Sequence, residues 1–506
     1  MGVIQNLKLW KNNVTHIDAN GNEVTEEVPR VMPPPPWKVV ALLDLKAWLY
    51  FCLGLAAWTA DGYDFNAVNL VATDLATVYG RDLSSITLSI TLTLLFRSVG
   101  AVLFGIMSDC FGRKWPLSAD LWILAGLQVA TAYVTEFSSF IAIRAIFGVA
   151  MGGIWGLSAA MSMENMPVEA RGLFSGLLQQ GYALGYLIAA VVNITAVRYT
   201  SEGYKAIFHV GAGFTGLVAL IVMFIPESPI FVNDDGENAG QMPLRHKVAG
   251  VWRDLKLASR LYWKIFLYCI ALCMGFNWMS HGSQDIYPSY LKVQKGFSSD
   301  QASVATIIGQ CGAIVGGAIC GYYSQFFGRR LTVVVACCFG ACIIPLWTIP
   351  NTWSPIVAGT FLIQAAVNGA WGIMPIFLNE YSPPQFRGVF PGTVYQIGNM
   401  LSSPAAQIST VAASNWIRDT PSGPKPNYSQ VMTITMCIVF TACAIIMACG
   451  QERLGSRFEV VTRAGAAQKI NPEDKIHSVE DGECETGLDD AVSHKEAPRA
   501  VYIEQV

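Results

Sequence analysis

Long apolar runs alternate with short polar segments between residues 46 and 450 of the chain. Each run is about 20 residues long, which is the length that an α-helix needs to cross the hydrocarbon core of a bilayer. The pattern therefore predicts an all-α membrane protein with about twelve transmembrane helices. Their expected bounds are 46–68, 84–108, 116–135, 139–161, 172–196, 205–225, 263–288, 302–324, 331–349, 355–378, 389–412 and 430–450.

Polar segments flank and separate two predicted six-helix bundles, which cover residues 46–225 and 263–450. Lysine and arginine are more frequent in one set of connections than in the other, and the richer set is expected to face the cytoplasm. We therefore expect three segments on the cytoplasmic side, namely an N-terminal segment, a central loop and an acidic tail over residues 1–45, 226–262 and 451–506.

Two kinds of modification site follow from this orientation. Asn427-Tyr428-Ser429 has the pattern of an N-glycosylation acceptor and falls in the last outer loop. The tail offers candidate acceptors for ubiquitin, which would make a ubiquitin ligase a partner of the cytoplasmic segments: Lys469, Lys475 and Lys495.

The composition restricts the class of protein further. Hydrophobic residues make up 53% of the chain and charged residues 14%, whereas a soluble domain carries roughly 25% charged residues. This excludes a soluble enzyme, a disordered protein and a nucleic-acid binder. The 13 cysteines lie mostly inside apolar runs without metal or disulfide spacing. Since no nucleophile–base pair appears either, we expect no enzymatic activity, no metal and no cofactor.

The two predicted bundles repeat each other at a constant distance of 216 residues. Short groups of identical or similar residues recur at that offset without gaps, which chance does not explain for several groups at once. A tandem repeat of six helices indicates two parallel halves with a substrate site between them, near the middle of the membrane. The matching positions are Gly105 with Gly321, Gly112 with Gly328, Arg113 with Arg329, Trp155 with Trp371, Arg171 with Arg387, and Gln180 with Gln396.

The segment Gly105-Ile-Met-Ser-Asp-Cys-Phe-Gly-Arg-Lys114 resembles the major facilitator signature G-x-x-x-D-x-x-G-R-[RK]. Arg144, Gly148 and Gly152 resemble a further motif of that superfamily, as does the segment 226–229. The resemblance implies the major facilitator fold and alternating access. In that reading Asp109, Gly112, Arg113 and Arg144 belong to the gating elements. The simpler alternative is that Arg113 and Lys114 only set the topology.

Charged groups inside a membrane span are costly and mark functional sites. Arg97 lies about 20 Å along the span 84–108, near its middle, and Asp61 and Asp64 lie in the outer part of the span 46–68. A guanidinium at that depth can hold a carboxylate through two parallel hydrogen bonds. The alternative is a structural ion pair between Arg97 and Asp61 or Asp64. Arg97 can serve in both ways if the substrate carboxylate displaces the aspartate from the guanidinium.

The span 263–288 carries a polar stripe. Asn277, Ser280, His281, Gln284 and Asp285 recur at spacings of three and four residues, so they share a helix face. His281 lies inside this predicted span, and histidine changes its charge near neutral pH. Asp285 lies one turn further on, where it can pair with the imidazole. We expect the pair to act in proton coupling, with Asp61 and Asp64 as alternative proton carriers.

The stretch Asn277-Trp-Met-Ser-His-Gly-Ser-Gln-Asp-Ile-Tyr-Pro-Ser289 resembles the signature N-x-x-[ST]-H-x-[ST]-Q-D-x-x-x-T of the fungal carboxylate:proton symporters, the Jen or lactate-permease family. Only the last position differs, with Ser289 in place of threonine. The resemblance implies proton-coupled uptake of small carboxylates across a fungal plasma membrane. It also implies that six residues shape the substrate path: Asn277, Ser280, His281, Ser283, Gln284 and Asp285.

Three amides in the spans 172–196 and 389–412 are further candidates for substrate binding. Gln396 and Asn399 share a helix face, and Gln180 is the repeat partner of Gln396. Their side chains could donate hydrogen bonds to a carboxylate. The alternative is that they only join neighbouring helices.

Together these features predict a proton-coupled importer of lactate, pyruvate, acetate, succinate or malate. Moving a carboxylate anion inward against about 100 mV costs ~2.3 kcal/mol, and one accompanying proton removes that cost. The expected partners are a small carboxylate, protons and the lipid bilayer. Two alternatives stay open: a facilitator for another anion such as sialate or phosphate, and a carboxylate sensor that does not transport. The sequence does not decide between mono- and dicarboxylates.

Overall fold

The computed structural model describes Leu9 and residues 13–17, 23–27, 29–81, 83–197, 199–227, 262–382, 389–420 and 423–454. All of them belong to one compact unit, Met1–Gly465. Most of the predicted central loop and the tail beyond residue 454 lie outside the described residues. The three tail lysines therefore lie outside them, and so does Arg387, which falls in the gap between residues 382 and 389.

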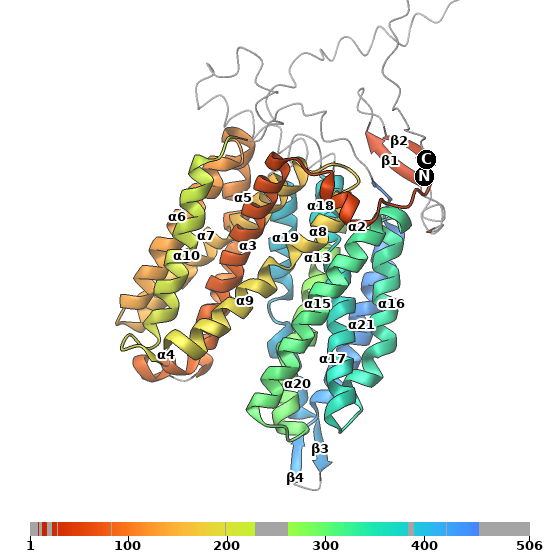
Figure 1. The fold of residues 1–506 in the computed structure, drawn as a ribbon. Coiled ribbons are helices and arrows are strands. Elements are labelled where there is room, and N and C mark those ends of the chain that lie inside the picture. Colours follow the sequence, from red (N-terminus) through yellow and green to blue (C-terminus); the bar gives the residue numbers. More distant parts are fainter. Residues whose placement is uncertain are drawn as a thin grey trace, which may run out of the picture. The chain divides into compact units, whose positions relative to one another are not determined.

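The first half of the membrane region consists of helices that match the first six predicted spans (Figure 1). The fifth span is divided, since Gln180 separates α8 from α9 and a π-helix, η1, follows α9. The helices are α3 (Leu45–Leu70), α4 (Ala72–Tyr79), α5 (Leu83–Phe111), α6 (Lys114–Tyr133), α7 (Phe137–Glu164), α8 (Arg171–Gln179), α9 (Gly181–Val192), η1 (Asn193–Val197) and α10 (Lys205–Phe224).

The second half repeats this arrangement with more interruptions. The predicted spans 263–288, 355–378 and 389–412 are each divided into successive helices. The elements are α13 (Trp263–Gln284), α14 (Tyr287–Ser289), η3 (Tyr290–Gln294), α15 (Ser299–Phe327), α16 (Arg329–Thr348), α17 (Trp353–Trp371), α18 (Met374–Tyr381), α19 (Val389–Ser402), α20 (Ala405–Asn415) and α21 (Tyr428–Cys449).

Nine helices within the described ranges are long and apolar enough to cross a membrane. The predicted spans 46–68, 116–135 and 389–412 are not among them. Asp61 and Asp64 lower the hydropathy of α3, and Asp120 and Gln128 lower that of α6. The span 389–412 is divided into two shorter helices, α19 and α20. The count of twelve spans stays a prediction.

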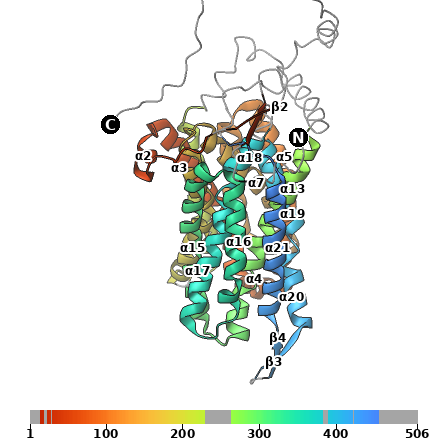
Figure 2. The same ribbon diagram turned by 90° about the vertical axis from the view of Figure 1, so that its right-hand side faces the viewer.

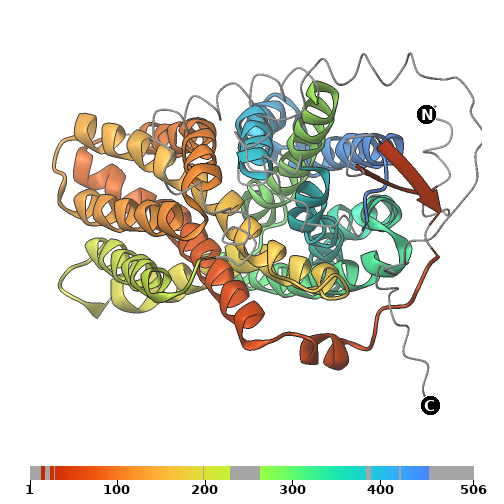
Figure 3. The same cartoon turned by 90° about the horizontal axis from the view of Figure 1, so that it is seen from above.

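The helices of the two halves form separate groups that meet at one end. Figure 1 shows the red-to-yellow helices of the first half diverging from the green-to-blue helices of the second toward α4 and α20. Seen from above, the two groups lie side by side (Figure 3). Contacts between the halves join α5 and α7 to α19, α8 to α15, and α7 and α8 to α18. We call the end at which they meet the basic end, because it carries Arg113, Lys114, Arg329 and Arg330.

Glycines allow the close approach at the basic end. A Cβ atom on Gly176 of α8 would lie 2.2 Å from the carbonyl oxygen of Gly317 in α15. A Cβ atom on Gly105 of α5 would lie 2.6 Å from the Cα atom of Val389 at the start of α19. Any larger side chain would therefore separate the halves at this end.

The N-terminal segment also forms regular structure, which the sequence pattern did not indicate. Strands β1 (Asn13–Ile17) and β2 (Glu23–Glu27) pair antiparallel, and the short helix α2 covers Pro36–Ala41. A second antiparallel pair, β3 (Ile417–Thr420) and β4 (Gly423–Pro426), lies at the end opposite β2 (Figure 2).

Candidate functional site

A buried ion cluster closes the first half at the basic end. The Arg113 guanidinium donates to Asp109 Oδ1 at 2.7 Å and to Glu164 Oε1 at 2.9 Å. Gly112 adopts a φ of 94°, a region that favours glycine, and the next residue's backbone N–H donates to Glu227 Oε1 at 2.9 Å. The structure thus assembles the predicted gating residues Asp109, Gly112 and Arg113 into one cluster.

The second half contains a copy of this cluster. The Arg329 guanidinium donates to both oxygens of Glu380 at 3.2 Å and to Ser324 Oγ at 2.6 Å. Glu164 and Glu380 are separated by the repeat distance of 216 residues, and the sequence analysis missed both. Outside the membrane-spanning helices, Glu452 accepts the backbone N–H of Arg330 at 3.1 Å, and burial raises the pKa of this carboxyl group.

In each copy the arginine also donates to a serine, Ser108 or Ser324, and the residue after that serine reaches into the opposite half. Asp109 Oδ2 accepts the backbone N–H of Val389 at 3.1 Å, and Gln325 Nε2 donates to the backbone oxygen of Val168 at 2.9 Å. Gln325 stands where the signature has an acid, and its amide can donate to a carbonyl oxygen, which a carboxylate cannot. The departure from the signature therefore has a structural reason.

Arg97 and Asp61 form an ion pair inside the first half. Nη2 of Arg97 lies 2.6 Å from Asp61 Oδ2, and the two side chains are 2% and 0% exposed. The guanidinium also lies over the Phe65 ring, 5.3 Å from its centroid. Asp61 Oδ1 and Arg97 Nε have no hydrogen-bond partner within the described residues. The pair is therefore held by one oxygen and one nitrogen only.

Asp64 occupies a second buried polar position, one turn along α3. It accepts hydrogen bonds from Gln128 Nε2 at 2.6 Å and from the Thr215 hydroxyl at 2.9 Å. Arg144 interacts electrostatically with Asp64 and lies 4.0 Å from the centroid of the Phe147 ring. Arg144 therefore interacts with Asp64 and does not belong to the cluster at the basic end.

Asp120 of α6 is a further buried acid that the sequence analysis did not single out. It is fully buried, and neither of its oxygens has a hydrogen-bond partner within the described residues. It interacts electrostatically with Asp61. An isolated polar residue in one predicted span would have been a signal for it.

The polar stripe of α13 is divided between two neighbouring helices. Nδ1 of His281 lies 2.9 Å from Asp285 Oδ2, and the His281 ring also interacts with the Asn399 side chain of α19. Ser280 and Gln284 instead contact α17, where they meet Trp371 and Gln364. Asn277 donates to the Cys273 backbone oxygen within α13.

Gln396 and Asn399 lie together on α19. Asn399 Nδ2 donates to Gln396 Oε1 at 3.4 Å, and Nε2 of Gln396 has no partner within the described ranges. Gln180 donates to the Gly176 backbone oxygen at 3.3 Å in its own half. Its side chain packs against Gly317 of α15, so it belongs to the contact between the halves.

Polar groups of both halves face a common region. Tyr182 of α9 interacts electrostatically with Arg97 in its own half and with Asp285 in the other. Tyr395 of α19 interacts electrostatically with Arg97 and Asp61. These interactions relate Arg97 of the first half to residues of the second half. Ser280, Ser283 and Gln284 bond instead to α17.

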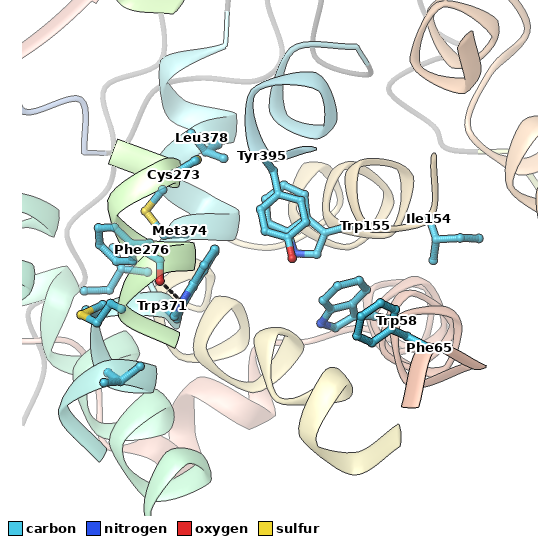
Figure 4. Packing of buried hydrophobic residues seen from close by; sticks show 14 of the residues in the cluster. Trp58, Phe65, Ile154, Trp155, Cys273, Phe276, Trp371, Met374, Leu378 and Tyr395 are labelled. Carbon is cyan, nitrogen blue, oxygen red and sulfur yellow. Dashed lines mark hydrogen bonds between the residues drawn. The ribbon is translucent and has the colours of Figure 1, made fainter. Parts of the chain in front are cut away.

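An aromatic layer, formed by Trp155, Tyr395 and Trp371, joins the halves beside this region (Figure 4). The Tyr395 ring stacks on Trp155 with centroids 4.4 Å apart and meets the edge of Trp371 at 5.6 Å. Trp155 and Trp371 are repeat partners. The sequence analysis used them only as evidence of the repeat and did not assign them to the site.

Asn427 caps the N-terminus of α21 and is 7% exposed. Its Nδ2 atom donates to Gln430 Oε1 at 2.8 Å. Glycosylation would replace one of the two hydrogens on that nitrogen and would require the nearly buried side chain to become accessible. No group of three potential metal-ligating side chains occurs in the described part of the chain.

Comparison with protein families gives a match over residues 48–407 to the Major Facilitator Superfamily. The chain is 31% identical to the carboxylic acid transporter protein homolog of Saccharomyces cerevisiae, over 80% of this chain and 68% of the relative. It is 24% identical to the 4-hydroxybenzoate transporter PcaK of Acinetobacter baylyi, over 80% of this chain and 91% of the relative.

Solved structures share the fold. The proton:xylose symporter XylE matches with a TM-score of 0.64 and 17% identity, over 82% of this chain and 98% of that chain. The human organic anion transporter MFSD10 matches with a TM-score of 0.61 and 15% identity, over 80% of this chain and 100% of that chain. These comparisons confirm the predicted major facilitator fold.

Proposed function

Because the chain belongs to the Major Facilitator Superfamily, we propose that it imports short mono- or dicarboxylates together with protons by alternating access. The substrates are of the size of lactate, pyruvate, acetate, succinate and malate. The observation that carries the proposal is the buried Arg97, which a single oxygen of Asp61 holds at 2.6 Å. The relatives support an organic acid, since carboxylic acids and 4-hydroxybenzoate stand in two of their names.

Arg97 is the group that binds the substrate carboxylate. Its Nε atom has no partner within the described residues, so the guanidinium keeps a donor for a second anion. A carboxylate that meets it in a nearly dry site gains a charge-assisted hydrogen bond. Nε2 of Gln396 is likewise free of partners in the described ranges and supplies a second donor, from the other half.

The proton is coupled through the acid that Arg97 already holds. When Asp61 is protonated, its ion pair with Arg97 is lost and the guanidinium becomes available to the substrate anion. One proton and one monocarboxylate then enter together, and the net charge of the site stays constant. Asp64 and the His281–Asp285 pair are further candidates for the proton, because they are ionisable side chains inside the membrane region. Each already takes part in a hydrogen bond that a proton would alter.

The halves meet at the basic end, which corresponds to a state closed toward the cytoplasm. Contacts of Asp109 with Val389 and of Gln325 with Val168 stabilise that state. Opening toward the cytoplasm requires both hydrogen bonds to break as one half rotates against the other. The basic end and both termini face the cytoplasm, and the protein resides in the plasma membrane.

The test is radiolabelled uptake in a yeast strain that lacks its own carboxylate permeases. Lactate and succinate are compared at pH 5 and pH 7, with and without a protonophore, and with sialate and phosphate as competitors. We expect uptake that is faster at pH 5, is abolished by the protonophore and is inhibited by neither competitor. A surface-localised protein that takes up neither acid would overturn the carboxylate assignment.

A further inference from the structure

We infer that Gln364 of α17 is a positioning residue for the substrate site, and that Ser280, Ser283 and Gln284 act through α17 without touching the substrate. The inference rests on the proposed function, because it assigns roles within that site. It starts from the way in which the polar residues of α13 divide between two neighbouring helices.

One stripe of α13 and α14 is hydrogen-bonded to α17 along its whole length. Ser280 Oγ accepts the indole N–H of Trp371 at 2.7 Å, and the Tyr287 hydroxyl is hydrogen-bonded to Thr360. Gln364 lies between these two contacts. We call this set of contacts the polar ladder; it consists of Ser280, Ser283, Gln284 and Tyr287 with Trp371, Gln364 and Thr360.

Gln364 is the central member of the polar ladder and uses both ends of its amide. Its Oε1 atom accepts from Gln284 Nε2 at 3.1 Å and from Asn368 Nδ2 at 3.3 Å. Its Nε2 atom donates to Ser283 Oγ at 3.2 Å. The side chain is 4% exposed, so these bonds form in a site from which water is largely excluded. An amide with this set of partners has little capacity left for a substrate.

The neighbouring stripe of α13, formed by His281 and Asp285, has no hydrogen bond to α17 among the described residues. His281 pairs with Asp285 and interacts with Asn399 of α19. Asp285 is 36% exposed and interacts electrostatically with Tyr182 of the first half. This stripe therefore faces the region shared by both halves, and it supplies the substrate contacts of α13.

The two stripes depend on each other because they lie on one helix. Residues three and four apart point along the same face, so the rotation of α13 about its axis decides which stripe meets the substrate. Gln364 fixes that rotation by holding Ser283 and Gln284. It also keeps Trp371 beside Ser280, and Trp371 contacts Tyr395 in the aromatic layer.

A double-mutant cycle on lactate uptake tests the inference. The variants are Gln284→Leu, Gln364→Leu and the double variant, with Gln407→Leu as the control because Gln407 is an exposed glutamine of α20. We expect each single change to raise the apparent KM about tenfold, as loss of a buried hydrogen bond does. The apparent KM of the double variant should not exceed that of the single variant with the higher KM, since all three variants lack the same contact.

Two further results would overturn the inference. If the effects multiply to about a hundredfold, Gln284 and Gln364 act independently. If Gln284→Leu or the milder Ser283→Ala changes the ratio of apparent KM values for lactate and succinate, the altered residue touches the substrate. We expect that ratio to stay constant.

The cycle is also measured as the unfolding temperature of the purified protein, which does not depend on transport. Shifts that do not add would support the pairing of Gln284 with Gln364 even if the wild-type protein transports neither acid, and additive shifts would refute it. A wild-type protein that transports neither acid would contradict the proposed function alone. Multiplying effects in a wild-type background that transports lactate would contradict the inference alone.

Discussion

Asp109 Oδ2 accepts a hydrogen bond from the backbone N–H of Val389 at 3.1 Å, although 280 residues separate the two along the chain. The other oxygen of the same carboxylate accepts from Arg113 at 2.7 Å. One side chain thus joins the ion cluster of the first half to the start of α19 in the second half. Closure of the basic end depends on this carboxylate.

We expect Asp109→Ala to shift the protein away from the state closed at the basic end. A hydrogen bond to a charged group contributes about 1.5–3 kcal/mol, so the shift in population should be at least about tenfold. The measurement is thiol labelling of Ser175→Cys from the basic side, in a background without native cysteines. Ser175 is fully buried between the halves and bonds to the Gly372 backbone oxygen. Equal labelling rates with and without Asp109→Ala would contradict this role, and Lys114→Ala is the control.

Gly176→Leu should abolish transport by preventing closure of the basic end. Even the first atom of the new side chain would lie 2.2 Å from the carbonyl oxygen of Gly317, which is backbone and has little room to move. The control is Gly213→Leu, because a Cβ atom at Gly213 meets nothing within 4 Å. Uptake is measured against the amount of protein at the cell surface. Normal uptake by a surface-localised Gly176→Leu protein would show that the two helices do not need to approach so closely.

Glu380→Gln should lower the stability of the second half. It leaves the Arg329 guanidinium, which is fully buried, without its charged partner, and breaking a buried pair in this way costs about 3–5 kcal/mol. Thermal unfolding of the purified protein measures the loss. The exposed Glu169 provides the control Glu169→Gln. A double variant, Arg329→Met with Glu380→Leu, should regain much of the stability, because it removes both charges.

Asp61→Asn should separate substrate exchange from proton-driven accumulation. The amide imitates the protonated acid, so Arg97 stays available to the substrate at every pH. We expect counterflow of labelled lactate to continue, while accumulation at pH 5 falls to the level of equilibration. Retention of protonophore-sensitive accumulation in Asp61→Asn would assign the coupled proton to another group, and Asp64→Asn is then the comparison to make.

Much of the fold followed from the sequence because the apolar runs are regular and the two halves repeat at a constant distance. The constant distance of 216 residues paired Arg113 with Arg329 and Trp155 with Trp371, and the structure places these pairs in corresponding positions. The same distance also pairs Glu164 with Glu380. Their role was missed because a glutamate at a helix end is common and its arginine partner lies 51 residues away.

The site was predicted less completely, because its contacts join distant segments. An ion pair of Arg97 with Asp61 or Asp64 was one of two alternatives that the cost of charges in a span allowed, and the structure shows the pair with Asp61. The division of the polar stripe of α13 did not follow, since helix periodicity gives one face but not the neighbours on either side of it. Gln364 of α17 became a candidate only through its contacts. Asp120 of α6 was missed although a lone acid in a predicted span is itself a signal.

The most direct test of the central claim, that Arg97 binds the substrate carboxylate, compares lactate uptake at pH 5 by the wild-type protein, Arg97→Ala and Arg97→Lys. Lys292→Ala, at an exposed position, is the control. With equal amounts of each protein at the cell surface, we predict loss of uptake in Arg97→Ala. Arg97→Lys should show partial uptake, because lysine keeps the charge but not the planar pair of donors. Unchanged uptake by Arg97→Ala would contradict the account.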